Sequence, residues 1–485
     1  MATNSVEPGA ALYVIFGGTG DLAQRLVLPA LYHLHARGEA ADIPIVAVTR
    51  GETDDAGYRG MITDALVRDG VALKKAAAWA RKFLYYQPIH DGTADDYRQL
   101  GNRLDEVEAA HKLPGNRVFY LALPPQVFGP TASGLARAGL NRAPGWVRLV
   151  VEKPFGRDLD SALKLNKELH KGWREDQIYR MDHFLGKETV QNLMVFRFAN
   201  AMFESLWNRE HISSVQINVP ETLGVEKRAG YYESAGVIRD MIQNHLTQIL
   251  TLVAMEPPST IEAAAIRQEK VKVLRSIQPI EPDDVVRGQY TAGRIGKRHV
   301  PAYRKEPGVA PDSTTSTFVA MKLEIDNWRW QGVPFLLRTG KRMATSLTEI
   351  VLTLREPPVS LFQPYDACQM SGDTLVLRLQ PDEGFVLYFD VKIPGPGFRL
   401  SREPLHFAYG EAFGPLPEAY ETLLLDVIQG EQMLFVHADE VEASWRLYTP
   451  VLENGGTPLP YPAGSWGPEE ANRLAGDGPL RWRNE

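Results

Sequence analysis

Residues 179–188 hold the densest group of chemically useful side chains in the sequence. Asp182 stands beside His183, and Lys187 follows four positions after the histidine, across Gly186. A carboxylate, an imidazole and an ammonium at this spacing can hold an anion and can tune a base. A solvated turn with an incidental ion pair is the alternative, so the weight of this stretch depends on the motifs that accompany it.

His245 is a second candidate base. It lies in a polar run on a helix that apolar spacing predicts over residues 236–255. A histidine on an apolar helix face is usually a core residue, but the polar run and Glu221, at the end of a predicted strand shortly before it, favour a site. An α-helical wheel turns Asp240 away from His245. The two converge on one ligand only if Asp240 lies at an irregular helix start.

These side chains need a scaffold, and a glycine-rich loop begins it. A predicted strand at residues 12–16 runs into this loop, and a helix follows at apolar spacing. Gly18, Gly20 and Ala23 fit the fingerprint in which glycines let backbone N–H groups approach a pyrophosphate at a helix N-terminus. The loop residues predicted to bind a dinucleotide are Gly17, Gly18, Thr19, Gly20, Asp21 and Leu22.

The next predicted strand, residues 43–48, indicates which dinucleotide. It ends at Thr49 and Arg50. An acidic residue at this strand end would accept from the ribose 2′-hydroxyl of NAD, whereas Arg50 can pair with the 2′-phosphate of NADP. Arg25 in the first helix is a possible second cation. The pattern favours NADP, although Glu52 leaves NAD open and an exposed loop arginine is the alternative for Arg50.

Two later strands end at the same predicted edge. Residues 118–123 stop at Pro124, and residues 147–151 stop just before Lys153. Ligands of open parallel sheets bind outside the carboxyl ends of the strands, so Pro124 and Lys153 are expected at the coenzyme crevice. A surface lysine before a turn is the alternative for Lys153. We place this Rossmann-like coenzyme domain at residues 1–185.

Long alternating strands replace the strand-helix units after about residue 200. They predict a β+α domain at residues 186–485 with one large, mostly antiparallel sheet, whose second face must be covered by helices or by another subunit. The strand at residues 334–338 ends in a cationic turn that contains Lys341. An edge lysine that blocks strand pairing is the alternative. The Gly- and Pro-rich residues 455–467 are expected to be a surface excursion and receive no chemistry.

Composition bounds the function. The 485 residues suggest two or three domains, and 44% apolar with 23% charged residues is typical of a soluble enzyme. A net charge of -7 gives no general attraction to nucleic acid or anionic lipid. The single cysteine, Cys368, excludes an internal disulfide, and no pattern indicates a zinc or other metal site. Without a signal peptide or a membrane-spanning run, a cytoplasmic protein is expected.

Together these segments resemble the glucose-6-phosphate dehydrogenase family, almost from end to end. The matching segments are residues 17–23, 120–125, 152–156, 179–188, 239–245, 334–341 and 432–448. The resemblance implies oxidation of the C1 hydroxyl of β-D-glucose 6-phosphate to a lactone, with hydride transfer to NADP, as the first oxidative step of the pentose phosphate pathway. It also implies a homodimer or homotetramer assembled through the large sheet.

The resemblance also implies roles for individual residues. His245 resembles the general base and Asp182 the carboxylate that orients it, roles that suit an imidazole with a pKa near neutrality. His183, Lys187 and Lys341 resemble the phosphate and sugar contacts, and Lys153 resembles a lysine that bridges substrate and coenzyme. The residues that resemble contacts near the sugar hydroxyls are Glu221, Asp240 and Gln380.

Two positions depart from the family pattern. Phe184 stands where many members have Tyr, which removes a possible hydroxyl contact to the phosphate. Animal members bind a second, structural NADP through cations beyond the Lys341 turn, but Leu347 and Val351 occupy that neighbourhood here, so no structural NADP is expected.

Two other functions remain open on the sequence alone. The first is an NAD- or dual-specific dehydrogenase for a related aldose phosphate. The second is a catalytically silent homologue that binds nucleotide and regulates a partner. The presence of His245, Asp182 and Lys187 disfavours the second, because such a protein would be expected to lose these residues first.

Overall fold

The computed structural model of the chain describes residues 9–40, 42–359, 361–362, 372–476 and 481–484. Cys368 lies outside the described residues. The chain divides into two compact units. The first contains residues 1–187, 260–267 and 417–442, and the second contains residues 188–259, 268–416 and 443–485.

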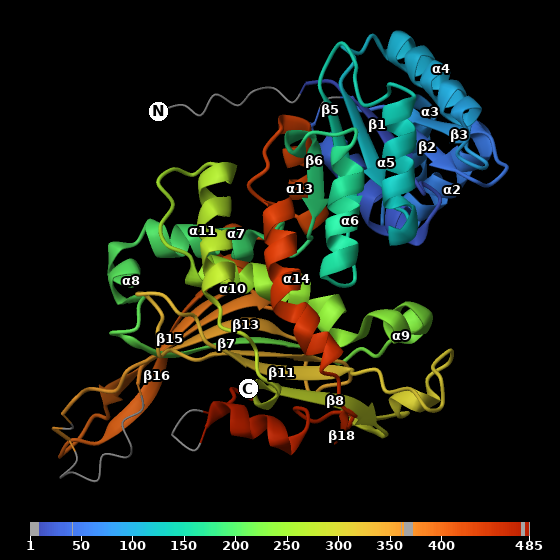
Figure 1. Cartoon of the computed structure of the whole chain (residues 1–485). Helices are drawn as coiled ribbons and strands as arrows, with labels where there is room; N and C mark the ends of the chain where they lie inside the picture. The colour runs from blue at the N-terminus through green and yellow to red at the C-terminus, as the bar shows by residue number, and fades with distance from the viewer. Residues whose placement is uncertain (1–8, 41, 360, 363–371, 477–480, 485) are drawn as a thin grey trace. The chain divides into compact units, whose positions relative to one another are not determined.

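A seven-stranded sheet forms the centre of the first unit (Figure 1). Its strands, in spatial order, are β17 (Phe435–Val436), β6 (Ile178–Met181), β5 (Val147–Glu152), β4 (Arg117–Leu121), β1 (Leu12–Phe16), β2 (Ile45–Thr49) and β3 (Leu84–Pro88). The six strands from β6 to β3 are parallel, and β17 is antiparallel to β6. This order is that of a dinucleotide-binding doubly wound fold. The predicted Rossmann-like architecture is therefore confirmed.

Helices cover both faces of this sheet. They are α1 (Leu28–Arg37), α2 (Asp55–Arg68), α3 (Leu73–Phe83), α4 (Ala94–His111), α5 (Phe128–Arg137), α6 (Leu159–His170) and α13 (Ala419–Gln429). Successive side chains of β4 alternate between the faces. On one face, the ring of Phe119 contacts Trp173, whose indole N–H donates to the carbonyl of Ala132 on α5. On the other face, the hydroxyl of Tyr120 donates to Glu152, which also accepts from Tyr420 of α13. The late helix α13 thus lies on the face opposite to α5.

A nine-stranded sheet forms the second unit. Its strands, in spatial order, are β16 (Leu400–Ala408), β15 (Gly384–Lys392), β14 (Thr374–Gln380), β13 (Thr348–Leu354), β7 (Ile212–Pro220), β12 (Phe335–Gly340), β11 (Phe318–Leu323), β8 (Val285–Thr291) and β18 (Leu459–Pro462). All neighbours are antiparallel except β7 with β12 and β8 with β18. The predicted large, mostly antiparallel sheet is confirmed. The Gly- and Pro-rich residues 455–467 were expected to be a surface excursion, but part of them forms β18. This strand lies at the edge of the sheet, and its backbone pairs with β8 although it contains two prolines.

The helices of the second unit lie mainly over one face of this sheet, where α7 and α10 are seen in Figure 1. They are α7 (Glu188–Phe198), α8 (Ala201–Leu206), α9 (Ala229–Val237), the π-helical segment η5 (Ile238–Leu246), α10 (Thr247–Ala254) and α12 (Tyr409–Phe413). Two further helices are α11 (Ala263–Ser276) and α14 (Ala438–Glu453). The side chains of α10 are all buried, which matches its unbroken apolar and small polar composition.

Candidate active site

Close packing explains the glycine loop after β1. Gly17 has a φ of 78°, and a Cβ there would lie 2.2 Å from the carbonyl oxygen of Ala122. A Cβ on Gly18 would lie 2.7 Å from the Cβ of Ala47 on β2. The backbone N–H of Gly20 donates to the carbonyl of Gly17 at 2.8 Å, which closes the turn. The glycines therefore permit a tight turn packed against the sheet, as in the phosphate-binding turn of a dinucleotide fold.

The remaining predicted coenzyme residues surround this turn. Thr19 lies in the turn, whereas Asp21 and Leu22 are the first helical residues after it, and the π-helical segment η1 (Ala23–Val27) follows them. Arg25 pairs with Asp21 at 3.1 Å, and both side chains are exposed. They line a groove of about 680 Å³ together with Gln24, Pro29, Ala65, Arg68 and Asp69.

Arg50 follows β2 and is exposed. The strand end before it is fixed by the Thr49 hydroxyl, which hydrogen-bonds the hydroxyl of Tyr86 at 2.6 Å, and Tyr86 in turn donates to the carbonyl of Gly51. Arg50 thus sits on a defined turn at the carboxyl end of a parallel strand, with its side chain open to a ligand.

A buried carboxyl group lies at the end of β5. Glu152 is 8% exposed, and its Oε1 accepts hydrogen bonds from the hydroxyls of Tyr120 at 2.5 Å and Tyr420 at 3.2 Å. Burial raises the pKa of Glu152, against the two tyrosine hydrogen bonds and the charge of Lys153, which lower it. Lys153 is half-buried and follows Glu152 directly, while Pro124 follows β4, the neighbouring strand. Both predicted residues therefore lie at the same edge of the parallel sheet.

Residues 182–187, which we call the anion loop, form a hydrogen-bonded turn after β6. Asp182 is 1% exposed, and its Oδ1 accepts the backbone N–H of Phe184 at 3.0 Å. Backbone N–H groups of Leu185, Gly186 and Lys187 donate to carbonyls three residues earlier. The local bonds mean that His183 and Lys187 are displayed by a preformed turn.

Phe184 has a specific place in the anion loop. Its ring lies 4.5 Å from the ammonium of Lys187, close enough for a cation–π interaction, and meets the ring of His183 edge-on at 5.0 Å. Phe184 is 7% exposed. The residue that departs from the family pattern therefore supports the two cationic or ionisable side chains of the loop.

The helix that carries His245 is π-helical in this part. Gly236, with a φ of 63°, breaks the helical backbone inside α9, and η5 begins two residues later. The backbone N–H of Thr247, the residue after η5, donates to the carbonyl of Ile242, five residues earlier, as well as to that of Asn244. The predicted α-helical wheel is therefore wrong over residues 238–246.

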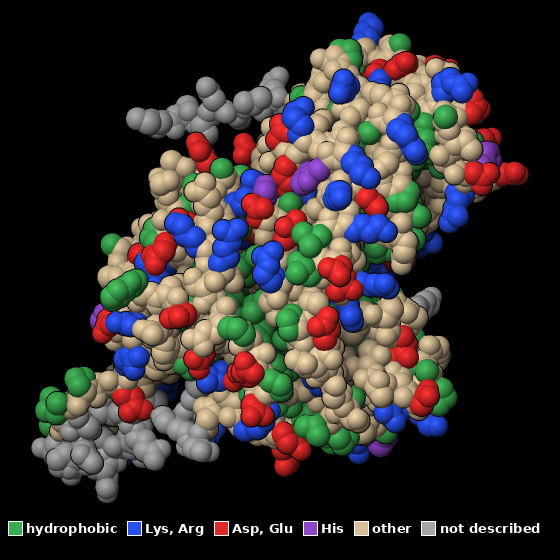
Figure 2. Space-filling model, viewed as in Figure 1, with side chains coloured by type: hydrophobic (Ala, Val, Ile, Leu, Met, Phe, Trp, Pro, Cys, Tyr) green, Lys and Arg blue, Asp and Glu red, His purple; other side chains and the backbone are tan. Residues whose placement is uncertain are grey.

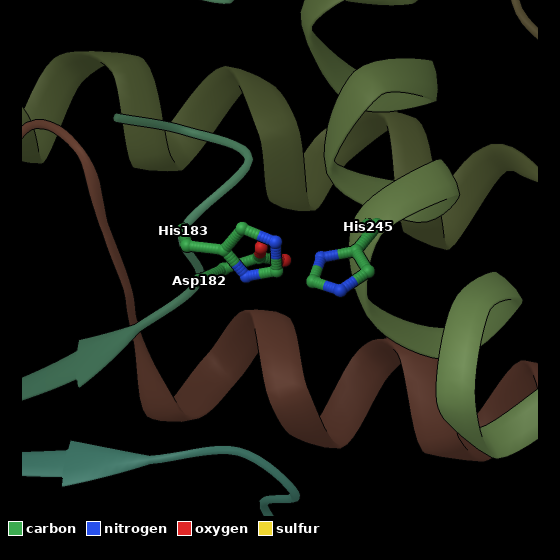
Figure 3. Close-up of side chains that lie close together, drawn as sticks. All are labelled: Asp182, His183 and His245. Atoms are coloured by element: carbon green, nitrogen blue, oxygen red, sulfur yellow. The ribbon is translucent and has the colours of Figure 1, made fainter. Parts of the chain in front are cut away.

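The π-helix changes which side chains share a face. Its hydrogen bonds join residues five apart, so such residues lie on the same side of the helix. Asp240 and His245 are five apart and are 2% and 1% exposed. They consequently lie on the same side of η5, which is the irregular helix start that their convergence was expected to require. Figure 3 shows the side chain of His245 on this helix, and the side chains of Asp182 and His183 on the segment that follows β6.

A charged cluster surrounds Asp240 in the second unit. The ammonium of Lys341 lies 2.5 Å from Oε2 of Glu221 and 4.0 Å from Oδ2 of Asp240. The hydroxyl of Tyr231 donates to Oδ1 of Asp240 at 3.3 Å, and a guanidinium nitrogen of Arg228 lies 3.5 Å from that oxygen. Burial, followed by the charge of Asp240, raises the pKa of Tyr231. Lys341 is thus held by two carboxylates, and Asp240 by two further donors.

Two residues near Asp240 could not be found from the sequence: Arg228, which directly precedes α9, and Tyr231, which lies in its first turn. Their only sequence signal is position, a helical turn or two before the break at Gly236. Gln380, which was predicted, ends β14 and pairs with Thr348 of β13. It therefore lies at the same edge of the sheet as Glu221, two strands away, and is exposed.

The surface charge and the helices also bear on whether a nucleic acid or a membrane is a partner. On the face seen in Figure 2, Lys and Arg side chains are interspersed with Asp and Glu. None of the helices that the structure describes combines the length and the apolar character needed to cross a membrane.

Two family models match almost the whole chain. The model "Glucose-6-phosphate dehydrogenase, NAD binding domain" matches residues 14–192, and "Glucose-6-phosphate dehydrogenase, C-terminal domain" matches residues 194–483. Glucose-6-phosphate 1-dehydrogenase of Rhizobium meliloti (strain 1021) is 46% identical over 478 residues, which cover 95% of each chain. The enzyme of the same name from Bacillus subtilis (strain 168) is 43% identical and covers 100% of both.

Solved structures of the same family are also similar to this chain. A glucose-6-phosphate dehydrogenase in complex with its substrate glucose 6-phosphate superimposes with a TM-score of 0.89 at 34% identity, covering 98% of this chain and 99% of that one. A glucose-6-phosphate 1-dehydrogenase from Mycobacterium avium gives a TM-score of 0.85 at 36% identity, with the same coverage. The chain therefore belongs to the glucose-6-phosphate dehydrogenase family.

Proposed function

We propose that the protein oxidises the C1 hydroxyl of β-D-glucose 6-phosphate to 6-phosphoglucono-lactone and passes the hydride to NADP. The observation that carries this proposal is the π-helical η5, which sets the buried His245 and Asp240 on one side, with Lys341 and Glu221 beside Asp240. A buried imidazole next to acceptors for sugar hydroxyls suits proton removal from a sugar. The proposed pathway is the first oxidative step of the pentose phosphate route.

His245 is the proposed general base. Loss of a hydride from C1 requires that the proton of the C1 hydroxyl leave at the same time, and a neutral imidazole takes it near neutral pH. Asp182 is the proposed partner of His245. A carboxylate on the second ring nitrogen would select the tautomer that presents a lone pair to the substrate and would stabilise the imidazolium that forms.

The anion loop is the proposed phosphate site. His183 and Lys187 project from its turn and can donate charge-assisted hydrogen bonds to phosphate oxygens. Such bonds are worth about 1.5–3 kcal/mol each, which would separate the sugar phosphate from the free sugar. Lys341, Glu221, Asp240 and Gln380 are the proposed contacts to the sugar, and Lys153 the proposed bridge between substrate and coenzyme.

The proposed coenzyme is NADP, whose nicotinamide ring accepts the hydride from C1 when it is bound. The glycine loop supports a dinucleotide because its tight turn, closed by the bond from Gly20 to Gly17, leads from the carboxyl end of β1 into a helix N-terminus. Arg50 is exposed at the carboxyl end of β2, where it can pair with a 2′-phosphate. NAD as a weaker alternative rests on Glu52 nearby. We expect no metal in the reaction, since a base and a hydride acceptor suffice.

The proposed assembly is a homodimer or homotetramer through the large sheet. The edge strand β16 and its surroundings expose large apolar side chains, among them Leu405 at 58%, Phe398 at 45% and Phe413 at 71%. A second copy would cover them. We also propose a cytoplasmic location, and no nucleic-acid or membrane partner.

One assay tests the reaction. Absorbance at the NADPH and NADH wavelength follows reduction of NADP or NAD with glucose 6-phosphate, with glucose and other aldose phosphates as controls, and with a chelator in a parallel series. The proposal expects rapid NADP reduction with glucose 6-phosphate, unchanged by the chelator. Binding of NADP without its reduction by any sugar phosphate would overturn it in favour of a non-catalytic homologue.

A further inference from the structure

Helix α13 braces the anion loop, although it comes late in the chain. A Cβ on Gly186 would lie 2.5 Å from the carbonyl oxygen of Ala419 and 2.8 Å from Cγ of Leu423, both on α13. Gly186 is therefore needed for this close approach. The turn that displays Lys187 rests directly on the backbone of the helix.

Tyr420 of α13 contacts the loop through its ring. The ring lies parallel to that of His183, with an interplanar angle of 16° and a centroid distance of 6.3 Å. Such an offset arrangement is favourable between aromatic rings. Tyr420 is 8% exposed, so its ring has little freedom to turn. The imidazole of His183 therefore has the rings of both Tyr420 and Phe184 as aromatic neighbours.

The hydroxyl of Tyr420 is anchored on the other side. It donates to Oε1 of Glu152 at 3.2 Å, and the same oxygen accepts from Tyr120. Glu152 is the residue before Lys153, at the carboxyl end of β5. The tyrosine thus connects a fixed point of the parallel sheet with the imidazole of the anion loop.

We propose that Tyr420 is a positioning residue for substrate binding that acts through His183. The ring of Tyr420 holds the imidazole of His183 in the orientation in which it meets the phosphate, and the hydrogen bond to Glu152 holds the ring of Tyr420. This inference rests on the proposed function, because it takes His183 as a phosphate ligand. It adds a residue from α13 to the binding site.

A double-mutant cycle tests the proposal. The variants are Tyr420→Leu, Tyr420→Phe, His183→Ala and the two double variants, and the measured quantities are KM for glucose 6-phosphate, kcat and the dissociation constant of NADP. Loss of the stacked ring in Tyr420→Leu is expected to raise KM roughly three- to tenfold. Tyr420→Phe keeps the ring and is expected to raise KM about twofold, since only its anchor is lost. NADP binding should not change.

The decisive result is the behaviour in the His183→Ala background. If Tyr420 acts through His183, neither change at Tyr420 raises KM further once the imidazole is gone. Tyr97→Leu is the matched control, because Tyr97 is also buried, at 6% exposed, but lies on α4. It should leave KM unchanged even where it lowers the melting temperature.

Each contrary result has a distinct meaning. An unchanged KM in His183→Ala would remove the proposed phosphate role itself, and the inference with it. A raised KM in His183→Ala, with additive effects of the Tyr420 variants, would overturn the inference and leave the proposed function standing. If Tyr420→Leu does not fold, the cycle built on Tyr420→Phe decides by the same criterion.

Discussion

Lys341 and Glu221 are neighbours because β7 and β12 are adjacent parallel strands. Pro220 pairs with Gly340 at the ends of the two strands, so the next residues, Glu221 and Lys341, leave the sheet at the same edge. Their side chains meet at 2.5 Å between Oε2 and Nζ. The C-terminal ends of two parallel strands thus bring together a carboxylate and an ammonium that are distant in sequence. Asp240 of η5 lies 4.0 Å from the same ammonium.

The first prediction concerns the base. His245→Ala is expected to lower kcat about 10²- to 10⁴-fold, since general-base catalysis is lost. NADP binding, measured by fluorescence titration, should be unchanged because the glycine loop is untouched. His211→Ala is the control, as that histidine is exposed and precedes β7. Turnover within a few-fold of the parent would show that His245 is not the base.

The second prediction concerns coenzyme choice. Arg50→Ala is expected to raise KM for NADP roughly 10- to 100-fold, because a charge-assisted contact to the 2′-phosphate is lost. KM for NAD should change little, since NAD lacks that phosphate. Arg25→Ala serves as a comparison, as Arg25 is already paired with Asp21. Equal losses with both coenzymes at Arg50 would mean that it does not distinguish them.

The third prediction concerns Phe184. Phe184→Leu removes the ring beside the ammonium of Lys187 and is expected to raise KM for glucose 6-phosphate about two- to fivefold, the size of a cation–π contribution at a partly exposed site. Phe184→Tyr keeps the ring and adds a hydroxyl, so KM should fall or stay equal. Steady-state kinetics at fixed NADP measure both. A KM in Phe184→Leu equal to that of the parent would remove the supporting role of the ring.

Local patterns predicted much of this fold. The glycine loop after β1 and the strand ends at Arg50, Lys153 and Lys341 could be found because apolar runs, glycines and prolines mark them within a few residues. The alternation of the later strands likewise predicted one large sheet. These features depend on side-chain periodicity and turn chemistry, which a single sequence contains.

Other features depend on geometry that the sequence does not display. The α-helical wheel was wrong over η5 because this segment is π-helical. Apolar residues indicate a helix there but do not show whether its hydrogen bonds join residues four or five apart. The approach of α13 to Gly186 depends on tertiary packing, and so does the stacking of Tyr420 on His183. The pairing of β7 with β12 is equally invisible, since no short-range signal specifies which strands become parallel neighbours.

A partly buried ion-pair network in the first unit predicts how stability responds to acid. Glu175 accepts from Arg180 at 2.6 Å, from the backbone N–H of Ala438 at 2.9 Å, and lies 2.7 Å from His170. Burial alone would raise the pKa of Glu175, but the charge of Arg180 and these hydrogen bonds lower it from 4.5 to about 2. The ionised form of Glu175 is therefore stabilised in the folded protein.

The sign of the fourth prediction follows from this lowered pKa. The folded pKa lies below the unfolded one, so the stabilisation is complete above about pH 4.5 and is lost as the pH falls toward 2. The difference corresponds to about 3 kcal/mol at neutral pH. Glu175→Gln is expected to lose stability at pH 7 and to show a weaker decline between pH 5 and 2, measured as the free energy of unfolding in urea. Asp176→Asn, at an exposed neighbour, is the control and should keep the parent's decline. If Glu175→Gln lost stability with acid as steeply as the parent, Glu175 would not be the source of the acid sensitivity.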